Sequence, residues 1–254
     1  MTHHFQIHMH GQSDIGRKRE RNEDAIIWDA ETGLAVLADG MGGHQAGEVA
    51  SQLALDVIQR VLGKVLQDPV DDLTEYGRTL LTAVHQANRE IYSQSVQRSE
   101  YAGMGTTLVM LLFAERWVFC SHVGDSRAYR LRDGVLQRLT SDHSLVQQMV
   151  DTGQYDEEQA RRSVSRNIIT RALGIAEEVA VDSDVYEVHE GDIYLLCSDG
   201  LTDLLAEQEI RGTLMYNRDD LPEAARLLVE LANAQGGKDN ISVILAAVRA
   251  AGSS

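Results

Sequence analysis

The chain has 254 residues, with 23 Lys and Arg against 39 Asp and Glu, and its formal net charge is −16. Such an acidic surface repels nucleic acid and anionic lipid, so it excludes those partner classes and favours metal cations. The 43% hydrophobic content is that of an ordinary globular protein, and the apolar runs fall short of the roughly 18 residues that a membrane span needs. No secretory signal is visible, and the two cysteines lie inside apolar stretches, as expected of buried thiols in a reducing compartment. We therefore expect a cytoplasmic protein.

The first hundred residues predict a strand, a hairpin and two helices. Residues 5–9 alternate between apolar and polar side chains, which indicates an edge strand, and the short apolar runs 25–28 and 34–38 indicate a hairpin. Residues 46–66 repeat apolar side chains at helical spacing and predict a helix that packs on a sheet. A second helix is predicted over 73–92.

The remaining residues predict further strands around a flap. Segments 106–113, 116–123, 126–132 and 135–139 are expected to form one antiparallel meander, followed by strands 185–188, 192–198 and 241–248 and by a helix over 222–234. Residues from about 141 to 174 lack strand patterns and are interpreted as an inserted flap, with helices from Leu145 and near Asp156 on either side of Gly153. The prediction is an α+β fold, a four-layer α/β/β/α sandwich of two antiparallel sheets flanked by helices, in a single domain over 1–254.

Carboxylates stand at the ends of four predicted strands. Glu23-Asp24 and Asp239 precede strands, whereas Asp39 and Asp199 follow them. Because antiparallel strands begin and end at the same edges, one edge can gather all of these acids, whose mutual repulsion divalent cations would relieve. Each Asp-Gly pair alone is typical of a turn, but the four sites together indicate a centre for hard cations such as Mg²⁺ or Mn²⁺.

Six short motifs extend this observation over the chain from about residue 13 to 248. In order, they resemble the motif series of the metal-dependent type 2C protein serine/threonine phosphatases (the PPM family) in their compact bacterial form. The motifs are Gly16–Asp24 (GRKRERNED), Ala38–His44 (ADGMGGH), Met104–Thr107 (MGTT), Val123–Arg127 (VGDSR), Cys197–Gly200 (CSDG) and Gly237–Asn240 (GKDN).

The resemblance implies a centre of two Mn²⁺ or Mg²⁺ ions, with a possible third, that hydrolyses phosphoserine and phosphothreonine in proteins. The implied partners are phosphorylated proteins and a cognate Ser/Thr kinase whose action is reversed, and a monomer is expected. The implied ligands are Asp39, the Gly40 carbonyl, Asp199 and Asp239, with Glu23 and Asp24 binding directly or through metal-bound water, and Asp125 holding the third ion together with Asp199.

Two further residues complete the predicted chemistry. Two cations roughly 4 Å apart can bridge a water, lower its pKa and direct the hydroxide at phosphorus, with Asp39 as the bridging ligand. Within the basic run 17–21, the resemblance selects Arg19 as the guanidinium that binds the phosphate and assists catalysis. His44 is the candidate general acid for the departing alkoxide. Some family members have a His directly after the Gly of the Asp-Gly pair, whereas three residues separate His44 from Gly40 here. A role of His44 in shaping the loop is therefore the alternative.

Other functional classes fit less well. A cysteine phosphatase needs an Arg six residues after its Cys, but Ser126 follows Cys120 and Asp203 follows Cys197 at that spacing. Two alternatives to general phosphoprotein hydrolysis remain. One is a non-catalytic phosphoprotein-binding module on the same fold, which normally lacks a metal carboxylate, and the other is the dedicated phosphatase of an anti-sigma-type partner switch.

Overall fold

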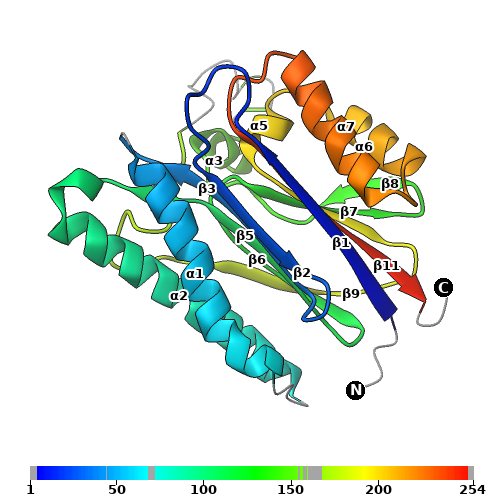
Figure 1. Cartoon of the computed structure of the whole chain (residues 1–254), viewed down its shortest axis with the longest axis horizontal. Helices are drawn as coiled ribbons and strands as arrows, with labels where there is room; N and C mark the ends of the chain where they lie inside the picture. The colour runs from blue at the N-terminus through cyan, green and yellow to red at the C-terminus, as the bar shows by residue number, and fades with distance from the viewer. Residues whose placement is uncertain are drawn as a thin grey trace.

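Two antiparallel sheets form the centre of the computed structural model, which describes residues 5–43, 45–67, 72–153, 155, 156, 159 and 168–250. Figure 1 shows the sheets stacked between helices. In order across each sheet, the first contains β1 (Phe5–Asp14), β11 (Ile241–Ala250), β10 (Ile193–Cys197), β7 (Arg127–Arg132) and β8 (Val135–Arg138), and the second contains β2 (Asp24–Asp29), β3 (Leu34–Met41), β5 (Leu108–Ala114), β6 (Trp117–Val123) and β9 (Asp182–Glu187), with β4 (Gly105–Thr106) beside β3.

Helices cover the outer face of each sheet, which confirms the predicted four-layer sandwich. Helices α1 (Ala46–Gln67) and α2 (Leu73–Gln97) pack on the second sheet, and α6 (Glu207–Tyr216) and α7 (Leu221–Ala234) pack on the first (Figure 1). The shorter elements are a 3₁₀ turn (Ser99–Tyr101), α3 (Leu145–Asp151) and α5 (Asp199–Thr202).

Three apolar clusters fill the interfaces between the four layers. Along β5, Met110 faces the helices α1 and α2, whereas Leu111 faces the other sheet. Along β11, Val243 faces α6 and α7, whereas Ile244 faces the opposite sheet. Successive side chains of a strand point to opposite faces, so strands covered on both faces need apolar residues at nearly every position. This explains the continuous apolar runs in the sequence.

The predicted four-strand meander over 106–139 is wrong. β6 pairs with β5 and β9 in the second sheet, whereas β7 pairs with β8 and β10 in the first. The chain passes between the sheets through the turn at residues 124–126, where Gly124 has a φ of 106° that only Gly adopts readily. Spacing along the sequence pairs β5 with β6 and β7 with β8, as the structure has them, but it does not show that the chain changes sheets between β6 and β7. The sequence analysis also omitted α6, whose buried side chains, Ile210 and Leu214, form too short a stripe to be distinctive.

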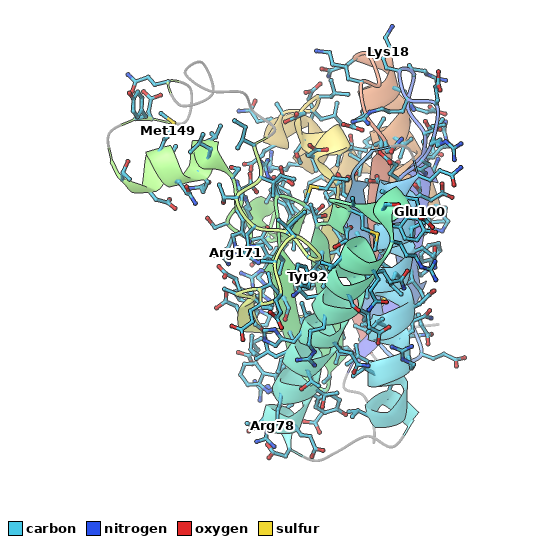
Figure 2. All side chains as sticks on the ribbon, turned by 90° about the vertical axis from the view of Figure 1, so that its left-hand side faces the viewer. Lys18, Arg78, Tyr92, Glu100, Met149 and Arg171 are labelled. Carbon is cyan, nitrogen blue, oxygen red and sulfur yellow. The ribbon has the colours of Figure 1, made fainter. Side chains whose placement is uncertain are left out.

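The described part of the predicted flap contains one helix. α3 begins at Leu145 as predicted, with Ser144 Oγ accepting a hydrogen bond from the Gln147 N–H at 3.2 Å. None of its side chains is buried, and Figure 2 shows Met149 of α3 projecting away from the sheets. The second helix predicted near Asp156 falls largely outside the described residues. Among the described helices, none is both long and apolar enough to cross a membrane.

Candidate active site

The strand ends that carry the predicted metal ligands meet at one edge of the two sheets. The register of β2 on β3 places Asp24 opposite Asp39. On the other sheet, Cys197 at the end of β10 lies opposite Val243 and Arg127, so the segments with Asp199, Asp239 and Asp125 converge there. Figure 1 shows α5 and the loop after β1 at this same end. Antiparallel pairing thus assembles acids from five separate segments.

We call these five acids the carboxylate cluster, and burial and mutual repulsion together raise the pKa values of two of them, Asp39 and Asp199. Burial raises the pKa of Asp39 well above its usual range, and the charges of the other four members raise it further. The pKa of Asp199 is raised in the same way, first by burial and then by neighbouring carboxylates. The members are Asp24, Asp39, Asp125, Asp199 and Asp239.

Two oxygens of the carboxylate cluster lack the hydrogen bonds that burial normally demands. Oδ2 of Asp24 accepts a hydrogen bond from Ser198 Oγ at 2.9 Å, but its Oδ1 and the Oδ1 of Asp125 are buried without a hydrogen-bond partner. Burial is the main cause that raises the pKa of each of these side chains to about 6. Carboxylate oxygens in this state are the donor set that suits hard divalent cations, so the residues present fit such a centre.

The MGTT motif fixes the backbone of Asp39. Thr107 Oγ1 accepts the Asp39 N–H at 3.0 Å, while the Thr107 N–H and the Thr106 hydroxyl each donate to the Asp39 carbonyl at 2.9 Å. The same Thr107 hydroxyl lies 2.7 Å from Ser126 Oγ, next to Asp125. The motif therefore holds two ligand-bearing segments in one arrangement.

Close backbone packing explains the Gly that follows Asp39. The Gly40 N–H donates to the Glu23 carbonyl at 3.1 Å. A Cβ on Gly40 would lie 2.1 Å from the Gly47 carbonyl oxygen and 2.6 Å from that of Glu23, both backbone atoms. The start of α1 and the segment before β2 therefore approach Gly40 more closely than any side chain permits.

Arg19 lies at the rim of the carboxylate cluster. Its Nη2 donates to Asp239 Oδ2 at 2.7 Å, its Nη1 lies 3.8 Å from Glu23 Oε2, and 44% of the side chain is exposed. Burial raises the pKa of Glu23 while the charge of Arg19 opposes that rise. The fork is thus placed where a phosphate approaching the cluster would meet it. His44 lies outside the described residues.

Asn240, which the sequence shows only as the neighbour of Asp239, organises the backbone around the site. Its Nδ2 donates to the carbonyls of Ile15 at 2.9 Å and Arg21 at 2.8 Å, and its Oδ1 accepts the Glu23 N–H at 2.8 Å. The residue is 4% exposed. One amide side chain therefore shapes the whole loop that carries Arg19, and only contacts over more than 200 sequence positions reveal it.

Asp203 is a further acid at the site that was not predicted from the sequence. Asp203 lies one helical turn after Asp199, and its N–H donates to the Asp199 carbonyl at 2.8 Å. Its charge contributes to the raised pKa values of Asp125 and Asp199. Its four-residue spacing from Asp199 is the signal in the sequence that could have revealed it.

Replacing Asn240 tests its role in the loop. Asn240→Ala leaves a buried N–H and two carbonyls without partners, so we expect it to lower the free energy of unfolding by about 1–3 kcal/mol or more. Urea unfolding of Asn217→Ala provides the control, because that side chain makes one local bond to the Thr213 carbonyl. Equal losses in the two variants would contradict the role of Asn240.

The raised carboxylate pKa values predict that a divalent cation stabilises the fold more at higher pH. The folded-state pKa values of Asp24 and Asp125 are about 6, against an ordinary 3.8. The stability that these groups contribute is therefore present below about pH 4 and is lost as the pH rises through about 6. Bound cations offset the loss, so the gain in Tm on adding Mn²⁺ should be larger at pH 8 than at pH 5.

A buried histidine also titrates in this pH range, but its effect cancels in the measurement. Burial lowers the pKa of His143 from 6.5 to about 4, so its contribution is present above pH 6.5 and is lost as the pH falls toward 4. This effect is common to the protein with and without Mn²⁺ and cancels in the difference between their Tm values. A Tm gain that is independent of pH would contradict the prediction, and Asp24→Asn should flatten the pH dependence.

Known proteins resemble this chain over nearly its whole length. Residues 11–246 match the family model described as protein phosphatase 2C. The serine/threonine phosphatase stp of Listeria monocytogenes is 39% identical over 244 residues, which cover 94% of this chain and 95% of the relative. The serine/threonine protein phosphatase PstP of Mycobacterium tuberculosis is 41% identical over 237 residues, which cover 93% of this chain but 44% of the relative.

Solved structures agree. A crystal structure of the M. tuberculosis phosphatase PstP superposes with a TM-score of 0.87 at 39% identity, covering 96% of this chain and 99% of that one. The catalytic domain of PstP in complex with 2 manganese ions gives a TM-score of 0.85, with the same identity and coverage. With the two sheets, their helices and the gathered carboxylates, these matches place the chain in the protein phosphatase 2C family.

Proposed function

We propose that this chain hydrolyses phosphoserine and phosphothreonine monoesters in proteins, with divalent cations held by the carboxylate cluster. The observation that carries the proposal is the gathering of five carboxylates at one sheet edge of a protein phosphatase 2C fold, four with pKa values raised by burial and two with unpartnered buried oxygens. Relatives named serine/threonine phosphatases support the substrate class, and the PstP complex with 2 manganese ions supports Mn²⁺. The oxygen donors suit Mg²⁺ equally well.

We assign two ions to the centre and a third to its margin. Asp39, the Gly40 carbonyl, Asp199 and Asp239 bind directly in this assignment, and Glu23 and Asp24 bind directly or through water. Asp125 holds the third ion together with Asp199. The mutual effects of these side chains on their pKa values support a shared centre.

The chain's own residues then bind and orient the phosphate. When bound, the cations supply an activated water and neutralise the negative charge of the site. The carboxylate cluster by itself repels a phosphate dianion, so Arg19 offers the one described positive fork bonded to the cluster, and its two nitrogens match two phosphoryl oxygens. His44 is assigned the proton donor for the departing serine or threonine oxygen.

The remaining assignments follow from charge and from the cysteines. The partners proposed are phosphorylated proteins and a cognate Ser/Thr kinase, and the protein is proposed to act as a monomer in the cytoplasm. Cys120 and Cys197 are buried free thiols, as in proteins of a reducing compartment. Burial raises the pKa of each to about 12, which leaves both thiols unreactive near neutral pH. Retention of every carboxylate in the motif series favours an enzyme over a binding module.

Loss of a charged ligand tests the centre. Asp39→Asn or Asp239→Asn should lower kcat on a phosphothreonine peptide by at least ~10³-fold while the protein stays folded, because each removes a ligand charge from the metal site. Circular dichroism and Mn²⁺ calorimetry check folding and binding. The control is Asp219→Asn, since that carboxylate is 82% exposed and pairs with Arg249 at the far end of β11. Wild-type activity that persists after metal is removed completely would overturn the proposal.

Arg19 is tested by the geometry of its fork. Arg19→Lys keeps the charge but loses the paired N–H groups, so we expect KM for a phosphopeptide to rise about 3-fold, and about 10-fold or more in Arg19→Ala. Arg17→Ala removes a neighbouring exposed charge and serves as the matched control. Equal effects at Arg17 and Arg19 would mean that the basic run acts only through long-range attraction.

A further inference from the structure

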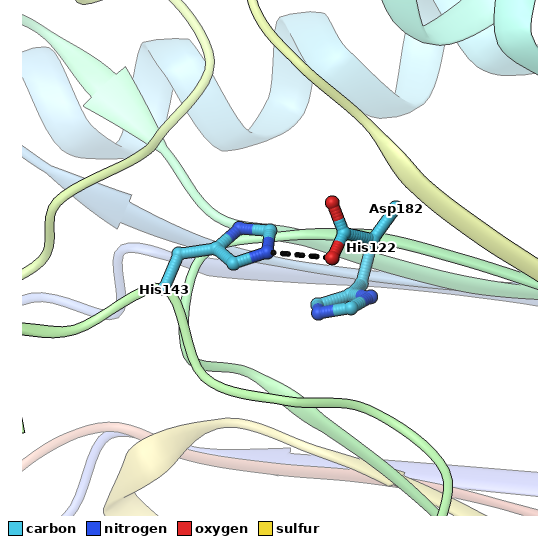
Figure 3. Close-up of side chains that lie close together, drawn as sticks. All are labelled: His122, His143 and Asp182. Atoms are coloured by element: carbon cyan, nitrogen blue, oxygen red, sulfur yellow. Dashed lines mark ion pairs between the residues drawn. The ribbon is translucent and has the colours of Figure 1, made fainter. Parts of the chain in front are cut away.

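A second polar group lies behind the turn that carries Asp125. It contains His122 on β6, His143 just before α3 and Asp182 at the start of β9, with one nitrogen or oxygen from each within 4.8 Å of the others. Figure 3 shows the His143 ring directed at the Asp182 carboxylate, with His122 beside them. Two imidazoles and a carboxylate are a common ligand set for transition metals, so their hydrogen bonds decide between a metal site and a structural network.

The hydrogen bonds of His143 determine where its proton lies. The Gly124 N–H donates to Nδ1 at 3.0 Å, so Nδ1 must present a lone pair. Two groups lie near Nε2: Arg171 Nη1, a donor, at 3.0 Å, and Asp182 Oδ2, an acceptor, at 3.4 Å. Because Asp182 is the acceptor among these partners and Nδ1 faces a donor, the neutral ring carries its proton on Nε2, directed at Asp182. Burial is the main cause that lowers the pKa of His143 to about 4, which keeps the ring neutral near pH 7.

This arrangement is unsuited to a metal ion. A cation bound to Nε2 would move the ring proton to Nδ1, directly against the Gly124 N–H. His122 Nε2 faces the Ser141 carbonyl at 2.8 Å, which can only accept, so this nitrogen also carries a proton. Arg171 Nη1 lies 2.6 Å from Asp182 Oδ1 and already supplies the positive charge that this carboxylate needs. The group is a hydrogen-bonded network.

The network holds the turn of Asp125 from one side. The His143 backbone N–H donates to the Gly124 carbonyl at 2.9 Å, so one residue satisfies both the N–H and the C=O of Gly124. Its neighbour Asp142 accepts hydrogen bonds from Arg127 Nε at 3.0 Å and Nη2 at 2.6 Å. The turn that carries Asp125 is therefore hydrogen-bonded on both sides, with His143 bound to Gly124 before it and Asp142 bound to Arg127 after it.

On its other side, His143 is joined to the segment that follows α3. The Thr170 N–H donates to the His143 carbonyl at 2.7 Å, and the Leu145 N–H donates to the Ile168 carbonyl at 2.9 Å. Arg171 then bonds to Asp182 beside the ring. Figure 2 shows Arg171 on the side of the molecule from which α3 projects.

We propose that His143 is a positioning residue that fixes the Gly124 peptide, and through it the Asp125 carboxylate, against the Asp182–Arg171 pair. The inference rests on the proposed role of Asp125 in binding a cation. Hydrogen bonds that orient a metal ligand typically change metal affinity or activity by 10–100-fold when they are lost. His143 should therefore control how much Mn²⁺ the enzyme needs, with little effect on KM for the phosphopeptide.

Three substitutions separate the two sides of the ring. In His143→Asn, Oδ1 takes the place of Nδ1 and can accept the Gly124 N–H. In His143→Gln, the amide reaches toward Asp182 but presents a methylene to Gly124, and His143→Leu offers neither contact. We expect the Mn²⁺ concentration for half-maximal activity to stay near that of the wild type in His143→Asn. It should rise about 10-fold or more in His143→Gln and His143→Leu.

Two measurements besides activity accompany these titrations. Nitrogen NMR of the metal-free wild type should show His143 protonated on Nε2. The Gly124 amide signal should shift in His143→Gln and His143→Leu but little in His143→Asn. Mn²⁺ calorimetry should show weaker binding of one ion in His143→Gln and His143→Leu than in the wild type. The positioning role is overturned if His143→Gln and His143→Leu lower the Tm but leave the Mn²⁺ requirement unchanged. It is also overturned if His143→Asn raises the Mn²⁺ requirement as much as His143→Leu. A Zn²⁺-induced transfer of the ring proton to Nδ1 would likewise overturn it in favour of a metal site.

Asp125→Ala distinguishes failure of this inference from failure of the proposed function. If Asp125→Ala raises the Mn²⁺ requirement while the Gln and Leu variants do not, the His143 inference fails and the cation role of Asp125 stands. If Asp125→Ala leaves the requirement unchanged, the cation role of Asp125 fails and the inference fails with it. Loss of activity in Asp39→Asn is independent of both results.

Discussion

The gathering of five carboxylates at one sheet edge, four of them with pKa values raised by burial, is the constraint on which the rest of the structure depends. Burial disfavours the charged forms of Asp39 and Asp199, and repulsion from the neighbouring carboxylates raises their pKa values further. The three apolar clusters between the four layers supply the stability that holds the acids together. These clusters include side chains of the same strands whose ends carry the acids. Divalent cations remove the repulsion, which links metal binding to folding.

Segments far apart in the sequence hold one another at this edge. Asn240, beside one proposed ligand, shapes the loop of Arg19 and Glu23, and Thr107 joins the backbone of Asp39 to the hydroxyl of Ser126. Asp142 and His143 hold the turn that carries Asp125 by hydrogen bonds to Arg127 and Gly124. The ligand positions are therefore not independent, since a change in one motif alters the backbone that carries the next. This interdependence accounts for the order of six short motifs over almost the whole chain.

Local patterns predicted most of the fold and the pairing of its hairpin strands, but not the change of sheet between β6 and β7. The helix over 46–66 and the apolar strands were predictable because their burial requires a periodic or continuous apolar pattern. The meander over 106–139 was wrong because β6 and β7 look like consecutive hairpin strands, although the chain changes sheets at Gly124. α6 was missed because it buries only Ile210 and Leu214. The predicted role of His44 is untested because that residue lies outside the described part of the chain.

The sequence by itself determined which acids stand at strand ends, because a turn residue and an apolar run are adjacent along the chain. It also determined that oxygen ligands dominate, which restricted the metal to a hard cation. Only the tertiary structure decided that Asn240 satisfies three backbone groups, that Asp203 joins the electrostatics of the site, and that His143 carries its proton on Nε2. Each of these depends on partners brought together from separate strands and loops, and no local pattern records such contacts.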